Sequence, residues 1–153
     1  MAEKKIRTEM EFNYRLIGVA SSLKEYKFCY HLNQLLNVDF IKLNDLVFQS
    51  TDRTRPIQFG VFKAGDEEEK NQFFVFNNKN LGEVLLLEAV NFDFIIQIKG
   101  ECNEKERTAI LDGIKAFPEI LICAEIPLKK IKSKERLVYF EETFSVKPIK
   151  KFK

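Results

Sequence analysis

Residues 91–100 read NFDFIIQIKG, and this stretch decides the fold that the sequence predicts. Its apolar side chains recur at every second position, which is the period of a β-strand with one buried face. We expect a sheet to be arranged around this strand, with two helices over its buried face. The side chains expected to point into the core are Phe92, Phe94, Ile96 and Ile98.

Further strands and two helices are predicted on either side of this stretch. The strand at 14–20 carries apolar residues on both faces, so we expect it to lie inside the sheet and to be covered twice. Each helix should begin at a capping box, in which a Ser or Asn stands three residues before a Glu. The two boxes are Ser22 with Glu25 and Asn103 with Glu106, and the helices should end near Asn37 and before Pro118. The other expected elements are strands at 39–43 and 120–126, a hairpin at 57–76 and a short apolar piece at 84–87.

This order of elements predicts an α+β fold, with a mainly antiparallel sheet and two helices on one face. The outline β-α-β…β-α-β is typical of a ferredoxin-like split unit, here enlarged by the inserted hairpin. A chain of 153 residues fits one domain that can bury its own core. We expect a flexible lead-in at 1–12, a single α+β domain at 13–140 and a basic C-terminal tail at 141–153.

The composition excludes several function classes. There are 25 Lys and Arg against 23 Asp and Glu, giving a formal net charge of +2, and this balance does not predict a nucleic-acid partner. No apolar stretch follows Met1, and no run approaches the roughly 20 apolar residues that a membrane-spanning helix needs. We therefore expect a cytoplasmic protein that does not enter a membrane.

Few residues are suited to covalent or metal chemistry. His31, the only histidine, falls inside the first predicted helix and near no nucleophile, so we do not expect it to be a catalytic base. The three cysteines have no paired spacing, which favours packed, reduced thiols over a zinc site. Cys102 stands at a helix start, where a thiol pKa can be lowered, but no partner base is near it. We predict no catalytic residue, no metal and no cofactor.

One stretch resembles the signature of the IPExxxVDY family, a group of uncharacterised bacterial proteins. In residues 86–94, LLEAVNFDF, Glu88 and Asp93 match the two acidic positions of that signature, while Leu87 and Phe94 stand in place of its Pro and Tyr. Residues 14–33, YRLIGVASSLKEYKFCYHLN, and 123–137, CAEIPLKKIKSKERL, are also similar to the family. The resemblance implies a cytoplasmic bacterial protein, and it implies no reaction, cofactor or catalytic residue.

Five polar residues form the candidate binding site. If Glu88 precedes the central strand and Asp93 lies on its outer face, the two carboxylates could converge for acid–base work or ion binding. Ser21 and Ser22 stand where a strand meets a helix, and free N–H groups at a helix start attract anions, with Lys24 close by. The alternative is structural: the serines cap the helix, Glu88 pairs locally, and Asp93 holds a neighbouring backbone group or a lysine.

Three functions follow from these patterns. The first is a non-enzymatic binding or regulatory module that acts as a homodimer, because the edges of an open sheet favour pairing. The alternative is a small-molecule (anion) binder or enzyme that uses Glu88, Asp93 and the Ser21–Ser22 helix start. A further alternative is an RNA- or ribosome-associated factor. Its basic residues would be Lys129, Lys130, Lys132, Lys134 and Arg136 with the C-terminal tail.

Overall fold

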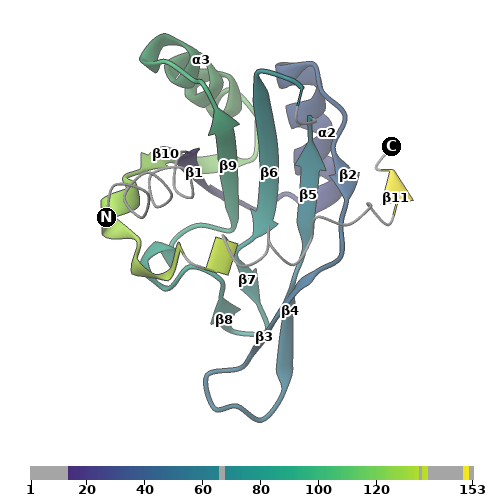
Figure 1. Ribbon diagram of the computed structural model, residues 1–153, viewed down its shortest axis with the longest axis vertical. Coiled ribbons are helices and arrows are strands. Elements are labelled where there is room, and N and C mark those ends of the chain that lie inside the picture. Colours follow the sequence, from purple (N-terminus) through teal and green to yellow (C-terminus); the bar gives the residue numbers. More distant parts are fainter. Residues whose placement is uncertain (1–13, 66–67, 135, 138–149, 152–153) are drawn as a thin grey trace, which may run out of the picture.

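Most of the described strands form one large antiparallel sheet. The computed structural model describes residues 14–65, 68–134, 136–137 and 150–151 (Figure 1). Among them, seven strands follow the order β10-β1-β9-β6-β5-β2-β11, and every neighbouring pair is antiparallel. These strands are β1 (Tyr14–Ser21), β2 (Ile41–Lys42), β5 (Val61–Ala64), β6 (Asn71–Asn77), β9 (Phe94–Gly100), β10 (Ile120–Ile126) and β11 (Lys150–Lys151).

The remaining elements surround this sheet. They are the helices α2 (Glu25–Leu36) and α3 (Glu104–Lys115), the strand pairs β3 (Leu46–Gln49) with β4 (Pro56–Phe59) and β7 (Lys79–Asn80) with β8 (Glu83–Val84), and the 3-10 turns η1 (Leu87–Ala89), η2 (Leu128–Lys130) and η3 (Lys132–Lys134). The fold is therefore α+β with a mainly antiparallel sheet, as predicted. The predicted lead-in at 1–12 and the predicted tail, apart from 150–151, lie outside the described residues.

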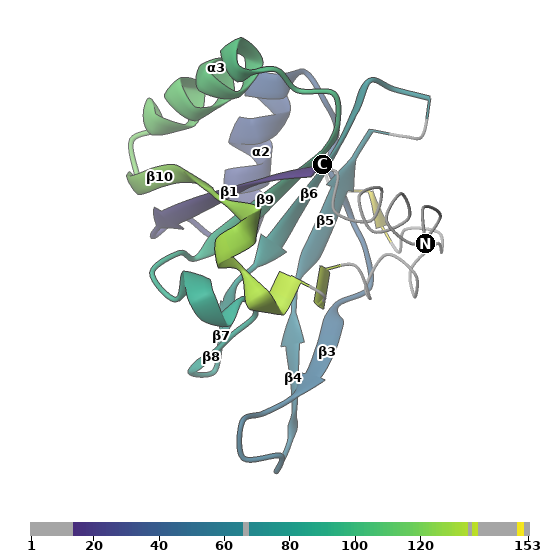
Figure 2. The same ribbon diagram turned by 60° about the vertical axis from the view of Figure 1, so that its left-hand side comes forward.

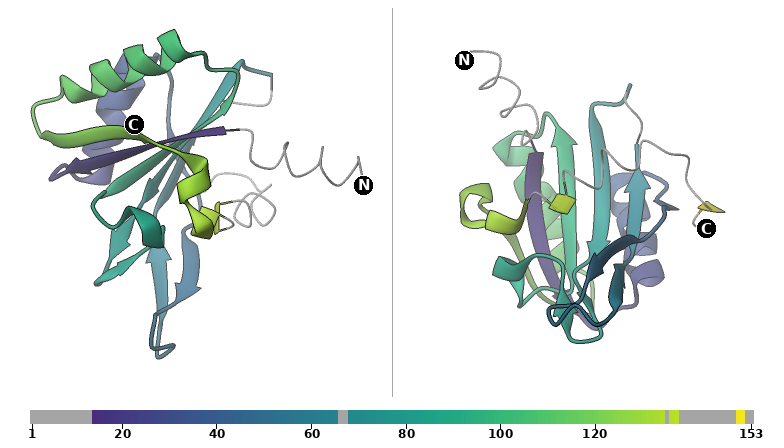
Figure 3. Two further views of the ribbon diagram at one scale, coloured as in Figure 1. Left: turned by 90° about the vertical axis from the view of Figure 1, so that its left-hand side faces the viewer. Right: turned by 60° about the horizontal axis from the view of Figure 1, so that its bottom comes forward.

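Both helices pack on the same face of the sheet (Figures 2 and 3). Phe28 and Leu32 of α2 and Ile114 of α3 are buried in one cluster with the inward side chains of β1 and β9. The rings of Phe28 and Phe94 stack with their centroids 4.6 Å apart. This cluster confirms the predicted burial of Phe94, Ile96 and Ile98 beneath two helices.

A second core covers the opposite face of the sheet. It is formed by apolar residues of β3, β4 and the segment before η1, which pack on Leu16 of β1 and Ile95 of β9. β1 is thus buried on both faces, as its sequence predicts. β9 is also buried on both faces, and here the prediction of one exposed face was wrong, because Ile95 and Gln97 are fully buried.

Phe92 does not join the helix-side core as predicted. It packs against the second core, with its ring close to Gly18 of β1. The reason is a local irregularity at the start of β9. Phe94 pairs with Val19, yet the N–H of Asp93 also donates to the Val19 carbonyl at 2.8 Å. Asp93 and Phe94 therefore both lie opposite Val19, as in a β-bulge, and the alternation of faces is broken at this point.

The two predicted helix starts differ in outcome. The Asn103–Glu106 capping box is present, with hydrogen bonds of 2.8 and 3.3 Å. The Ser22–Glu25 box is not, because α2 begins at Glu25 with Lys24 as an N-cap that makes no side-chain hydrogen bond. Asn37 ends α2 in the left-handed conformation, as expected of a C-terminal stop.

The predicted hairpin at 57–76 is present only in its second half. β5 and β6 pair from Val61 with Phe76 to Ala64 with Phe73. The first arm is interrupted at Gly60, and residues before it form β4, which pairs with β3 instead. A Cβ on Gly60 would lie 2.9 Å from the Asn77 side-chain nitrogen, so a larger residue here would displace that amide.

Candidate functional site

Asp93 and Ser21, two of the predicted site residues, are brought together. The Asp93 carboxylate accepts a 2.9 Å hydrogen bond from the backbone N–H of Ser21, and its other oxygen lies 3.5 Å from the Lys79 ammonium. The Ser21 hydroxyl donates to the Glu119 carbonyl at 2.9 Å and accepts from the Leu23 N–H at 3.0 Å. These contacts fix the end of β1 against the start of β9.

Glu88 is held elsewhere. Its carboxylate accepts hydrogen bonds from the Ser133 hydroxyl at 2.6 Å and from the Ser133 N–H at 3.3 Å, which join η1 to η3. Partial burial opposes ionisation, but the hydrogen bonds from Ser133 outweigh it and place the pKa of Glu88 below its usual value. Among the described residues, no hydrogen bond or ion pair joins Glu88 to Asp93, Ser22 or Lys24.

Sequence reasoning missed the residue that organises the segment between them. Asn78, the residue that follows β6, is fully buried. Its side-chain amide donates to the carbonyls of Ala89 and Phe92 at 2.8 and 2.9 Å, and its side-chain oxygen accepts from the Leu86 N–H at 2.9 Å. One side chain therefore satisfies three backbone groups of residues 86–92. The only signal in the sequence is a polar residue that immediately follows an apolar strand.

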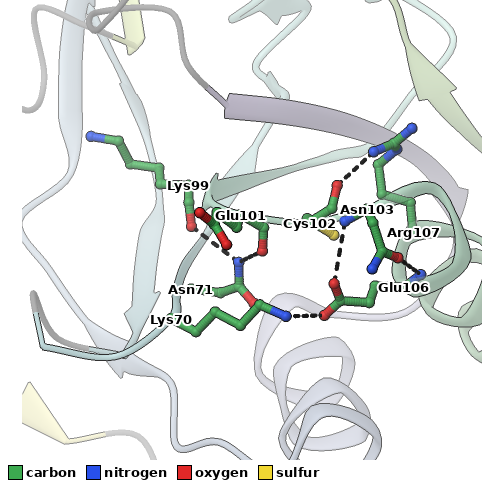
Figure 4. A network of polar contacts seen from close by, with 8 residues as sticks. All are labelled: Lys70, Asn71, Lys99, Glu101, Cys102, Asn103, Glu106 and Arg107. Carbon is green, nitrogen blue, oxygen red and sulfur yellow. Dashed lines mark hydrogen bonds and ion pairs between the residues drawn. The ribbon is translucent and has the colours of Figure 1, made fainter.

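A second polar network surrounds the start of α3 (Figure 4). The Glu106 carboxylate, which closes the capping box, also forms a 2.8 Å ion pair with Lys70, the residue before β6. Arg107 donates to the Cys102 carbonyl at 2.6 Å and to the Glu125 carboxylate of β10 at 3.2 Å. The network thus ties α3 to β10 on one side and to the β5–β6 connection on the other.

Cys102 borders a hollow of about 490 Å³, which is also lined by Tyr14 and Arg15 of β1. Burial and the nearby Glu106 carboxylate raise the pKa of the Cys102 thiol, despite the opposing charge of Arg107. The lowered pKa that its place at a helix start suggested is therefore wrong. A protonated thiol is a poor nucleophile, so the geometry gives no reason to assign covalent chemistry to this hollow.

The remaining chemistry-bearing side chains have structural contacts. His31 packs its ring 5.0 Å from that of Phe117. Arg136, one of the basic residues proposed for RNA, donates to the Leu85 carbonyl at 2.7 Å and stacks over Phe48. In the described parts of the chain, no three His, Cys, Asp or Glu side chains are grouped as metal ligands would be. No helix there has the length and apolarity to cross a membrane.

β10 forms an open edge of the sheet. Val19 of β1 directs its backbone groups toward β9, because its carbonyl accepts a hydrogen bond from the residue that precedes β9. The adjacent Gly18 therefore faces β10, where it pairs with Ala124. Alternate residues of a strand point to opposite neighbours, so Cys123 and Glu125 direct their N–H and C=O groups away from the sheet. No described residue pairs with them.

Two large apolar side chains lie on this edge. Leu121 is 79% exposed and Ile122 is 50% exposed. Alternation along residues 120–126 predicts that Ile120, Ile122, Ala124 and Ile126 share one face. The pairing of β10 with β1 shifts between Ala20 and Ser21, which breaks this alternation. Neither proline nor lysine, the residues that commonly protect a sheet edge, occurs in β10.

No protein-family model matches the chain. No curated protein matches its sequence either.

Proposed function

We propose that this protein is a non-enzymatic binding or regulatory module that acts as a homodimer. The observation that carries the proposal is the open edge of β10, with its outward backbone groups and the exposed side chains of Leu121 and Ile122. Unpaired strand edges with apolar side chains favour association with another strand. A second copy supplies the same edge at equal concentration, so self-association is the simplest way to cover it.

The non-enzymatic part of the proposal draws on how the reactive side chains are used. Asp93 and Glu88 bind backbone groups, and the thiols of Cys29, Cys102 and Cys123 have raised pKa values because of burial. The alternative of an anion binder or enzyme is supported only by the Ser21–Asp93 contact. In that contact the Asp93 carboxylate already accepts the hydrogen bond that the Ser21 N–H would have to donate to an anion.

The proposal extends to fold and family. We infer a ferredoxin-like arrangement enlarged by an insertion, and the order β10-β1-β9-β6, with α2 after β1 and α3 after β9, supports it. We also infer membership of the IPExxxVDY family and a cytoplasmic location. Family membership is supported by Glu88 and Asp93, which stand at the acidic positions of the signature and whose carboxylates accept hydrogen bonds from Ser133 and Ser21.

The oligomeric state tests the proposal. Light scattering on the full chain, from about 1 to 300 μM, should show a rise toward twice the chain mass of 18.0 kDa. Ile122→Lys should shift this rise to higher concentration, because a lysine protects a strand edge. Val47→Lys, at an apolar residue of β3 with a similar exposure of 54%, is the control and should not shift it. A mass of one chain throughout would overturn the proposal.

A further inference from the structure

The outward groups of β10 restrict how a second copy can pair with it. In an antiparallel pair, two opposite residues exchange hydrogen bonds only if both direct their backbone groups toward the partner. In β10 these residues are Cys123 and Glu125, and Pro127 after them has no N–H to donate. Leu121 lies at the irregularity opposite Ala20 and Ser21, so it does not continue the regular ladder.

We propose that β10 pairs with β10 of a second copy about a two-fold axis at Ala124, joining the two sheets into one. This inference rests on the proposed homodimer and specifies its interface. In this register Cys123 of each copy lies opposite Glu125 of the other, so both outward residues exchange their hydrogen bonds. With the axis at Cys123, Glu125 would lie opposite Leu121, which is outside the regular ladder. With the axis at Ile122, Cys123 would lie opposite Leu121 instead.

The side chains fit the same register. Ala124 would meet its own counterpart, and this small side chain allows the close approach of a non-hydrogen-bonded pair. The half-exposed Ile122 would lie opposite Ile126 of the second copy, which pairs two apolar side chains across the strands. Leu121 would face Pro127 of the second copy. The two exposed apolar residues of the edge would thus both be covered.

The charges fit as well. The Lys115 ammonium at the end of α3 is near enough to Cys123 to act on its thiol, although burial dominates and raises the pKa of that thiol to about 11. Since Glu125 of the second copy would lie opposite Cys123, its carboxylate, which accepts a 3.2 Å hydrogen bond from Arg107 of its own copy, would also approach Lys115. Centring on Ile122 would instead place Glu125 opposite the Glu119 carboxylate of the second copy, which is unfavourable.

A cysteine cross-link tests the register. The experiment uses the unmodified chain, which keeps Cys123, and the full chain with Cys123→Ser, to which either Ala124→Cys or Ile122→Cys is added. Non-hydrogen-bonded pairs have Cα atoms about 4.5 Å apart, within the range of a disulfide. The oxidation is mild and uses a protein concentration above the dissociation constant of the dimer. Under these conditions the Ala124→Cys variant should run as a covalent dimer on a non-reducing gel. Ile122→Cys and the Cys123→Ser parent should stay monomeric, and each variant should keep the parent's circular dichroism and melting temperature.

The outcomes separate this inference from the proposed function. If light scattering shows a dimer but Ile122→Cys or native Cys123 cross-links in place of Ala124→Cys, the register is overturned and the homodimer stands. If the dimer forms and none of the three positions cross-links, β10 is not its interface. If the chain is monomeric, both fall. Lys115→Glu should raise the dissociation constant by up to about fivefold, and 0.5 M salt should reduce that difference.

Discussion

The carboxylate of Asp93 accepts a 2.9 Å hydrogen bond from the backbone N–H of Ser21, a residue 72 positions away. The same aspartate uses its own N–H to bind the Val19 carbonyl and its own C=O to bind the Asn78 N–H. One residue therefore connects β1 to the segments that precede β9 and follow β6. These three contacts give Asp93 a structural role.

Replacing Asp93 should lower stability. Asp93→Ala leaves the partly buried Ser21 N–H without its acceptor, and we expect a loss of about 1–3 kcal/mol in the free energy of unfolding. Asp93→Asn keeps an acceptor oxygen and should cost less. Urea denaturation measures both, with Asp39→Asn on the exposed surface as a control that should stay within about 0.5 kcal/mol. Equal stability of all variants would contradict the role given to Asp93.

Removing the Asn78 side chain should be more damaging. Asn78→Ala leaves three backbone groups of the 86–92 segment unsatisfied, and we expect a loss of about 2–4 kcal/mol. Asn80→Ala is the matched control, because its amide makes an exposed 2.7 Å hydrogen bond to Gln58 and should cost about 1 kcal/mol or less. If the two variants unfold at the same urea concentration, Asn78 does not organise this segment.

Two glycines should respond oppositely to alanine. A Cβ on Gly18 would lie 2.5 Å from the Phe92 ring inside the sheet, and we expect Gly18→Ala to cost about 1–3 kcal/mol. Gly113 of α3 faces the end of the Leu35 side chain, which is 37% exposed and can move. Because alanine favours helices, Gly113→Ala should be neutral or stabilising by up to about 1 kcal/mol. Thermal melting of both variants checks the contrast.

The Gln97 side chain points to a stabilising substitution. This glutamine is fully buried in β9, and its side-chain amide has no hydrogen-bond partner among the residues that the structure describes. A buried amide without a partner costs about 1–3 kcal/mol, so Gln97→Met should raise the free energy of unfolding by roughly 1 kcal/mol. Gln58→Met at an exposed position of β4 is the control for the gain in apolar surface. A loss of stability in Gln97→Met would show that the amide is engaged.

Acid should weaken the contact between Lys70 and Glu106. The hydrogen bond from Lys70, with that from the Asn103 N–H, lowers the pKa of Glu106 below its usual 4.5. The stabilisation is therefore fully present above about pH 4.5 and is lost as the pH falls through the folded-state pKa. The pKa of Lys70 is raised above 10.5 by the same contact, so a matching loss is expected in strong alkali.

Glu106→Gln isolates this effect, because glutamine can still close the capping box. Its urea midpoint should lie below that of the unmodified chain at pH 7, and the two midpoints should converge toward pH 3. Glu104→Gln, in the same helical turn, controls for the loss of one negative charge at the helix start. A difference that stays constant from pH 7 to pH 3 would rule out the titration of Glu106 as its source.

The sequence predicted the layers of the fold better than their details. Alternating residues in 91–100 gave the central strand, and the Asn103–Glu106 pair gave the start of α3, because both depend on local spacing. The irregularity at Asp93 was not predictable, since it depends on pairing with Val19 from a distant strand. The burial of Ile95 and Gln97 was missed for a similar reason. It depends on a hairpin, β3–β4, that folds back over the second face.

The candidate site was predictable only in part. The sequence placed Ser21 where a strand meets a helix and Asp93 on the outer face of the 91–100 strand, and the two do meet. Glu88 is drawn away by Ser133, whose position depends on the turns after β10. The open edge was not visible either, because a strand's place in a sheet is decided by which neighbours it lacks, and that information is not local to β10.

The edge of β10 also sets a limit on growth. A strand that pairs with its own counterpart by two-fold symmetry is isologous, so each copy uses the edge that its partner needs. After one such event neither copy retains an unpaired β10. The other edge strand of each sheet is β11, which takes no part in this pairing. Association through this strand should therefore close at two chains and not continue into a filament.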